Sequence, residues 1–274
     1  MPNTGKTQKR IDAVFAALKQ KKEKALIAFI TAGDPDFAVT KDIVLTLEKN
    51  GADIIELGIP FSDPMADGPT IQASSERALK NGATLDGVLK TVKDIRKASE
   101  IPIVLFGYYN PILSYGLKKF AHDARLSGAD GALVVDLPPE EAGDFKKELD
   151  NVNMDLIFLL TPTSDDERMN LVAKRASGFI YFVSVTGVTG ARAALSSGVE
   201  SHVKKIKRHF TDLPVGVGFG VSTPEQAGLI AHFADGVVVG SAIINIIAKN
   251  KNTDDMLKEV GFFIAGLKKG MKPR

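Results

Sequence analysis

The sequence predicts an α/β fold, a (β/α)8 barrel of the TIM-barrel type, and three observations support this. Eight short apolar runs rich in β-branched residues recur along the 274 residues, and a stretch with helix signals follows each of them. The runs are apolar on both faces, as in parallel strands that helices cover. The first turn, TAGDPDF at 31–37, lacks the glycine spacing and the lysine of a nucleotide-binding open sheet. We therefore expect one barrel domain over residues 1–274.

A helix is predicted before the first strand, over residues 7–20. Its apolar residues recur at helical spacing and are Ile11, Val14, Phe15 and Leu18. Because this helix precedes the first strand, we expect it to plug the bottom of the barrel. The strands are predicted at 25–30, 53–57, 101–106, 131–135, 155–159, 179–183, 214–218 and 236–239.

Two of the later helices carry clear start signals. Thr223, followed by Pro224 and Gln226, predicts a capping box in which Thr223 is the N-cap. Ser164 and Glu167 have the same spacing, so Ser164 is predicted to cap the helix after the fifth strand.

Two connections are longer than the rest. The second and third strands begin 48 residues apart and the sixth and seventh 35 apart, whereas no other spacing exceeds 30. Barrels carry their chemistry on the loops at the carboxyl ends of the strands. Extended loops after strands two and six are therefore expected to contact substrate or to close over it.

The composition excludes several classes of function. Lys and Arg number 35 and Asp and Glu 33, and this balance argues against a nucleic-acid-binding surface. There is no cysteine, and no two of the four histidines have metal-ligand spacing, so no metal is expected. The apolar stretches are too short to cross a bilayer and the N-terminus lacks a signal core, so a cytoplasmic location is expected.

Glu56 is the first candidate catalytic residue. It interrupts the apolar second strand, where burial at the barrel mouth would raise its pKa and let it hold a proton near neutral pH. The alternative is a structural carboxylate paired with a Lys or Arg, which would have to come from a loop because the strand runs contain neither. The segment that follows holds Asp63 and Asp67, either of which could bind substrate or cap its own turn, and spacing does not choose between them.

Phosphate binding is predicted at the last two loops. Gly218 and Gly220 follow the seventh strand, and Gly240 and Ser241 follow the eighth and open a helix. Glycines let backbone N–H groups approach an anion, and a helix N-terminus adds free donors. The alternative is that these small residues only permit tight turns. After strand six, Thr189 and its neighbours in the segment 185–198 suit a mobile loop or, alternatively, a surface loop without a role.

Taken together, these segments resemble the tryptophan synthase α subunit family over nearly the whole chain. The motifs are ELGIPFSDPMADGPTIQ from Glu56, GYYNPI at 107–112, VDLPPEE at 135–141, SVTGVTGAR at 184–192, GFGVSTPEQ at 218–226 and GSAI at 240–243. The resemblance implies a carbon–carbon lyase, without a cofactor of its own, that cleaves indole-3-glycerol phosphate to indole and glyceraldehyde 3-phosphate in tryptophan biosynthesis.

The resemblance also implies roles for individual residues. Glu56 matches the family's proton-transferring glutamate, and Asp67 rather than Asp63 matches its indole-recognising aspartate. The other implied positions are Phe29, Phe106 and Phe219 around the indole ring, Tyr181 lining the site, Thr189 in the closing loop, and Gly190, Gly220, Gly240 and Ser241 in the phosphate cradle.

A partner is implied in the same way. Members of the family dock a β subunit that carries pyridoxal phosphate and pass indole to it through a tunnel, in an α2β2 heterotetramer. The loop after strand two and the GYYNPI motif are the expected docking face, with Tyr108, Tyr109, Asn110 and Pro111 exposed. Ordinary loop packing is the alternative for these residues. Two other functions compete with the lyase, a sugar-phosphate epimerase and a non-catalytic phosphate-binding activator of the β subunit.

Overall fold

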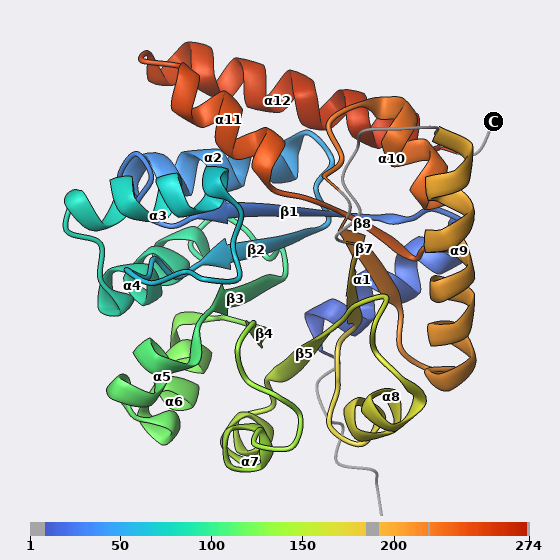
Figure 1. The fold of residues 1–274 in the computed structure, drawn as a ribbon. Coiled ribbons are helices and arrows are strands. Elements are labelled where there is room, and N and C mark those ends of the chain that lie inside the picture. The colour runs from blue at the N-terminus through green and yellow to red at the C-terminus, as the bar shows by residue number, and fades with distance from the viewer. Residues whose placement is uncertain (1–8, 185–191, 219, 273–274) are drawn as a thin grey trace, which may run out of the picture.

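All eight predicted strands form in the computed structural model, and they close into a parallel barrel in the order β1 to β8 (Figure 1). The structure describes residues 9–184, 192–218 and 220–272. Every strand boundary lies within two residues of its prediction. The strands are β1 (Ala25–Thr31), β2 (Ile54–Gly58), β3 (Ile103–Gly107), β4 (Gly131–Val134), β5 (Asp155–Leu160), β6 (Ile180–Val183), β7 (Val215–Gly218) and β8 (Gly236–Val239).

Apart from the first helix, the helices lie around the barrel on the outside of the strands (Figure 1). Within the described residues the helices are α1 (Arg10–Gln20), α2 (Phe37–Lys49), α3 (Pro69–Lys80), α4 (Leu85–Ile95), α5 (Tyr109–Tyr115), α6 (Leu117–Ser127), α7 (Gly143–Asn151), α8 (Asp166–Ala173), α9 (Arg192–His209), α10 (Pro224–Ala231), α11 (Ser241–Lys249) and α12 (Thr253–Gly270).

The two long connections have different structures. After β2, an irregular segment at 59–68 leads into two helices, α3 and α4, so most of the extra length is helical. After β6, the predicted loop 185–198 is too long, because α9 already begins at Arg192. The sequence from Arg192 to Leu195 is rich in helix-favouring Arg, Ala and Leu, which explains the early start. Residues 185–191 lie outside the described part of the chain.

Helix α1 plugs the amino-terminal end of the barrel, as predicted. Ile11, Phe15 and Leu18 are buried in one cluster with residues of the barrel interior, among them Ile54 of β2 and Phe179 just before β6. The rings of Phe15 and Phe179 have their centroids 5.9 Å apart. The helix therefore closes the bottom of the barrel and leaves the carboxyl ends of the strands as its open mouth.

Salt bridges bind α1 and α4 to this closed end. Asp130, just before β4, is 4% exposed. Its carboxylate accepts hydrogen bonds from Arg10 at 3.0 Å, from Arg96 at 2.8 Å and from the backbone N–H of Ile103 at 2.8 Å. A buried carboxylate held by two guanidinium groups and a backbone donor is fully compensated, so it stabilises the attachment of both helices.

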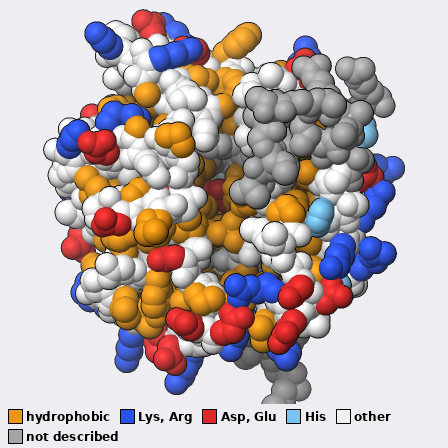
Figure 2. Space-filling model, in the orientation of Figure 1, with side chains coloured by type: hydrophobic (Ala, Val, Ile, Leu, Met, Phe, Trp, Pro, Cys, Tyr) orange, Lys and Arg blue, Asp and Glu red, His pale blue; other side chains and the backbone are white. Residues whose placement is uncertain are grey.

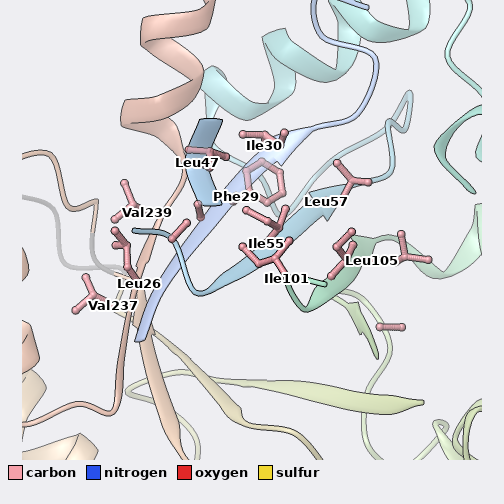
Figure 3. Packing of buried hydrophobic residues seen from close by; sticks show 14 of the residues in the cluster. Leu26, Phe29, Ile30, Leu47, Ile55, Leu57, Ile101, Leu105, Val237 and Val239 are labelled. Atoms are coloured by element: carbon pink, nitrogen blue, oxygen red, sulfur yellow. The ribbon is translucent and has the colours of Figure 1, made fainter. Parts of the chain in front are cut away.

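Strand residues that point outward form a second core between the barrel and its helices. Figure 3 shows Leu26, Ile30, Ile55 and Leu57 in this core, with Leu47 of α2 beside them. Because β2 is therefore buried on its outer side by α2, the opposite side of the strand, which carries Glu56, faces the barrel interior.

The predicted capping box of α10 is confirmed, because the Thr223 side chain accepts from the N–H of Gln226 and the Gln226 side chain bonds back. The predicted cap of α8 is wrong. Asp165, not Ser164, is the N-cap and accepts from the N–H of Arg168, while Ser164 accepts from the N–H of Thr161 in the preceding turn. Of the described helices, none is long and apolar enough to cross a membrane.

Candidate active site

Glu56 lies at the centre of the barrel mouth. It pairs in register with Phe29 of β1 and Val104 of β3 and is 0% exposed. Neither carboxyl oxygen has a hydrogen-bond partner in the described structure. Burial raises the pKa of Glu56 to about 8, because water no longer stabilises the charged form. The alternative of a structural ion pair therefore finds no support in the described residues.

Aromatic rings provide the apolar surroundings that keep Glu56 protonated. Phe29 and Phe106 meet edge to face, with centroids 5.1 Å apart. A Cβ atom on Gly58 would lie 2.8 Å from the Phe29 ring, so a larger residue there would force the ring to move. Gly240 contributes in the same way, since a Cβ there would lie 3.3 Å from Phe29. Phe29 is thus held against Phe106 near the carboxyl ends of β1 and β3.

Tyr181 reaches the same mouth from β6. Burial raises its pKa well above the ordinary value, and the nearby carboxylates of Glu56 and Asp67 raise it further. A Cβ on Gly218 would lie 2.6 Å from the Tyr181 hydroxyl oxygen, so the glycine of β7 makes room for this ring. The structure therefore brings together Glu56, Asp67 and Tyr181, which lie on three separate segments of the chain.

Asp67 and Asp63 have different environments. Asp63 is exposed and accepts from the hydroxyl of its neighbour Ser62 at 2.5 Å. Asp67 is half-buried, and its Oδ2 atom accepts a hydrogen bond from the hydroxyl of Tyr108 at 3.1 Å. Burial raises the pKa of Asp67, and the hydrogen bond from Tyr108 opposes that rise. Burial and hydrogen bonding therefore distinguish Asp67 from Asp63, which their spacing in the sequence does not.

The expectation that Tyr108 is exposed is wrong. The side chain is 5% exposed, and its ring packs on Phe61 with centroids 5.2 Å apart. Its neighbours are closer to the prediction, since Tyr109 and Pro111 are half-buried and Asn110 is exposed. Tyr108 is the site residue that sequence reasoning missed. Its position directly after β3, at the mouth end of a barrel strand, was the signal that could have found it.

The predicted phosphate cradle lies partly within the described residues. Gly240 precedes α11 without a side-chain cap, and its carbonyl accepts from the N–H groups of Ile243 and Ile244 at 2.8 and 3.1 Å. The N–H groups of Ser241 and Ala242, in the first turn, have no acceptor within the helix and are available to an anion. Ser241 is exposed, as this role requires.

Gly220 lies in the neighbouring loop, with a φ of +62° that favours glycine and open space beside it. Three predicted site residues, Thr189, Gly190 and Phe219, lie outside the described part of the chain.

The face of the molecule drawn in Figure 2 is hollowed near its centre, where an acidic side chain lies among hydrophobic ones. Among the described residues there is no group of three or more His, Cys, Asp or Glu that could hold a metal ion. The chemistry that this arrangement can supply is acid–base: a protonated carboxyl in an apolar mouth, a second carboxylate held by a phenol, and a helix N-terminus beside them.

Comparison with known proteins gives one family. The model of the family "Tryptophan synthase alpha chain" matches residues 15–272. Tryptophan synthase alpha chains of Geobacter sp. (strain M21) and Geotalea uraniireducens (strain Rf4) are 55% and 56% identical to this chain, over 96% of its length and 97% and 98% of theirs.

Solved structures agree with this result. Tryptophan synthase subunit alpha from Legionella pneumophila str. Paris superposes with a TM-score of 0.90 at 41% identity, covering 97% of this chain and 99% of that one. A chain of tryptophan synthase from M. tuberculosis, in its aminoacrylate-bound form, has a TM-score of 0.87 at 33% identity and covers 97% and 100%. The chain belongs to the tryptophan synthase alpha chain family.

Proposed function

We propose that Glu56 and Asp67 carry out the α reaction of the family, the cleavage of indole-3-glycerol phosphate to indole and glyceraldehyde 3-phosphate. Membership of the family makes the chain a lyase subunit of tryptophan biosynthesis. The observation that carries the residue assignment is the environment of Glu56. This carboxyl group is fully buried, has no hydrogen-bond partner among the described residues, and has a pKa of about 8 that keeps it protonated at neutral pH.

The chemistry needs such an acid. Breaking the carbon–carbon bond requires C3 of the indole ring to leave with the bonding electrons. Glu56 first gives its proton to C3, which places a positive charge on the ring nitrogen and makes the ring an electron sink. The bond to the glycerol carbon then breaks and its electrons restore the aromatic ring. The glycerol hydroxyl loses its proton, either to the Glu56 carboxylate or to a water beside it, and becomes the aldehyde.

Asp67 stabilises the charge that develops in this reaction. As a carboxylate it accepts the hydrogen bond of the indole N–H and opposes the positive charge of the protonated ring. Its half-buried position strengthens that interaction relative to water. Phe29, Phe106 and Phe219 are assigned to the faces of the indole, and Tyr181 to its rim.

The phosphate of the substrate is assigned to the last loops of the barrel. Gly190, Gly220, Gly240 and Ser241 form the proposed cradle, which the free N–H groups at the start of α11 support. Thr189 is assigned to the loop that closes over bound substrate, next to Asp67.

The family implies a β-chain partner. We assign docking to the segment 59–68, where Met65 is 91% exposed, and to the GYYNPI motif, where Asn110 is exposed. The groove along α3 adjoins this face. This groove has a volume of about 640 Å³ and is lined by Phe61, Pro64 and Gln72 among others. The groove combines apolar side chains with polar ones, among them Glu76 and Lys80, and such a mixed surface beside the mouth suits a partner that receives indole directly. A pyridoxal-phosphate β subunit, an α2β2 assembly, a cytoplasmic location and a single domain over 1–274 complete the proposal.

The test is indole release from indole-3-glycerol phosphate by the purified chain, alone and with a β subunit. We expect release in both cases and a faster rate with the partner. Glu56→Gln is expected to lose turnover while it keeps glyceraldehyde 3-phosphate binding, and Glu148→Gln, in α7 away from the mouth, is the matched control. Binding of glyceraldehyde 3-phosphate without indole release in either case would replace the lyase by a non-catalytic activator.

A further inference from the structure

We infer that Tyr108 is a positioning residue for Asp67: its hydroxyl holds Oδ2 of the carboxylate so that Oδ1 meets the N–H group of the substrate. This inference rests on the proposed role of Asp67. It adds a residue that follows a different strand, β3, and that need not touch the reacting atoms.

The direction of the hydrogen bonds is fixed by the partners. The backbone N–H of Ala66 donates to the Tyr108 hydroxyl oxygen at 3.0 Å. The hydroxyl lies 3.1 Å from Oδ2 of Asp67. An amide N–H can only donate, so the single hydroxyl hydrogen must point to the carboxylate. The phenol thus ties the backbone of one residue to the side chain of the next.

The rest of the segment 59–68 is fixed around the same ring. Phe61, near its start, packs on Tyr108 with centroids 5.2 Å apart. Near its end, the Nε2 atom of Gln72 in α3 donates to the backbone carbonyl of Asp67 at 2.8 Å. Tyr108 is 5% exposed and directly precedes α5, so it has a rigid base. A carboxylate held at both its backbone and one oxygen has little freedom to turn away from a ligand.

The same bond favours the charged form of Asp67. Burial raises the pKa of Asp67, and the Tyr108 hydroxyl lowers it. The pKa of Tyr108 is itself raised far above its ordinary value by burial and by the Asp67 charge, so the phenol stays a neutral donor throughout the working pH range. An ionised Asp67 is the form that accepts the indole N–H and opposes the ring cation.

Among the described residues, two other titratable side chains at the barrel mouth have to be considered, Tyr181, which interacts with Asp67, and Glu56. Tyr181 is neutral at working pH because its pKa is raised, and Glu56 has a pKa of about 8. Below neutral pH both are uncharged, so the acid limb of the pH–rate profile reports Asp67 rather than either of them.

The experiment compares Tyr108→Phe with Tyr115→Phe. The Tyr115 hydroxyl also lies 2.9 Å from carboxylates, those of Asp86 and Asp123, but it is away from the mouth on α5. We expect Tyr108→Phe to lower kcat about 10-fold or more, as for loss of a hydrogen bond to a charged group. The acid limb of the pH–rate profile of Tyr108→Phe is expected to move to higher pH, because Asp67 loses the hydrogen-bond donor that favours its charged form. In Tyr115→Phe, kcat and the acid limb are expected to equal those of wild type. The affinity for glyceraldehyde 3-phosphate is expected to be unchanged in both variants.

A second measurement does not depend on turnover. In protein labelled with carboxyl-13C aspartate, the NMR signal missing from Asp67→Asn identifies Asp67. Its titration moves to higher pH in Tyr108→Phe and stays in place in Tyr115→Phe. Replacing Tyr108 alone by 3-fluorotyrosine, which is a stronger donor of nearly the same size, moves it to lower pH. This replacement decides the question should Tyr108→Phe fail to fold.

The outcomes separate the two proposals. Equal Asp67 titrations in wild type, Tyr108→Phe and the fluorotyrosine protein overturn the positioning role, whatever the rates. A shifted titration with normal kcat and an unchanged acid limb also overturns it, because the bond would then have no bearing on the reaction. Wild-type protein that releases no indole overturns the lyase assignment of Asp67, and with it the positioning role in catalysis.

Discussion

Replacing Glu56 by Gln is expected to stabilise the protein while it abolishes turnover. The side chain is 0% exposed and its pKa is about 8 in the folded state, against 4.5 for the free group. A group whose pKa is raised on folding adds stability below the unfolded pKa and loses it as the pH rises to the folded pKa. Wild-type protein is therefore expected to lose stability from about pH 4.5 to about pH 8 through this residue alone.

The size of the effect follows from the two pKa values. Each unit of difference corresponds to about 1.4 kcal/mol, so the full loss above pH 8 is about 5 kcal/mol. At pH 7 the folded carboxyl is protonated and the unfolded one is ionised, which costs about 3 kcal/mol. The glutamine side chain of the variant does not ionise in either state. The variant is thus expected to exceed wild type in free energy of unfolding by about 3 kcal/mol at pH 7 and to match it near pH 4.

Urea unfolding followed by circular dichroism, repeated from pH 4 to pH 9, measures this difference. Glu148→Gln, the same substitution on α7 outside the barrel, is the matched control. The same pKa predicts a basic limb near pH 8 in the kcat/KM profile of wild type, because the reaction needs protonated Glu56. A difference between Glu56→Gln and wild type that does not vary with pH would refute the reasoning, because Glu56 would then titrate alike in both states.

Two further substitutions test the mouth and the closed end of the barrel. In Gly218→Ala the new methyl group would lie 2.6 Å from the Tyr181 hydroxyl oxygen, so the ring must move. We expect kcat/KM to fall at least 10-fold. The control is Gly143→Ala, whose Cβ would meet nothing within 4 Å and which is expected to leave kcat/KM unchanged. Normal turnover in Gly218→Ala would mean that the position of Tyr181 is unimportant. In Asp130→Asn the Arg96 guanidinium loses its buried counter-charge, and we expect urea unfolding to show a loss of about 3 kcal/mol with kcat unchanged. A loss below about 1 kcal/mol would contradict the stabilising role given to this pair.

The fold was predictable because each strand carries its own signal. An apolar run such as ALIAFI needs no information about the rest of the chain to be recognised as a strand buried on both faces. Helix ends are less certain where two capping residues stand together. Ser164 and Asp165 both suit an N-cap, and the choice depends on which backbone turn precedes the helix, which the sequence does not show.

The site was predictable where a residue broke the pattern of its own strand, and not where its role depends on another segment. Glu56 stands out because a carboxylate is unusual in an apolar strand. Tyr108 looks like an ordinary loop aromatic, because its bond to Asp67 joins residues 41 positions apart. The parallel pairing of β2 with β3 brings the end of β3 beside the segment after β2, and no local periodicity carries that information.

The other buried carboxylates in the described residues have cationic partners, so burial in this fold does not by itself leave a carboxyl group unpaired as Glu56 is. Among the described residues, Asp34, Asp130 and Asp155 are also buried, and each is paired with a cation: Asp34 with Arg77 at 2.6 Å, Asp130 with Arg96 at 2.8 Å, and Asp155 with Lys9 at 2.7 Å. In these pairs the cation offsets the cost of burying the carboxylate charge. A cation beside Glu56 would stabilise the protein at neutral pH in the same way, but it would lower the pKa and remove the proton that the reaction needs. The lack of such a partner among the described residues is therefore the feature that distinguishes the carboxyl group in the barrel mouth from the buried carboxylates that are paired with cations.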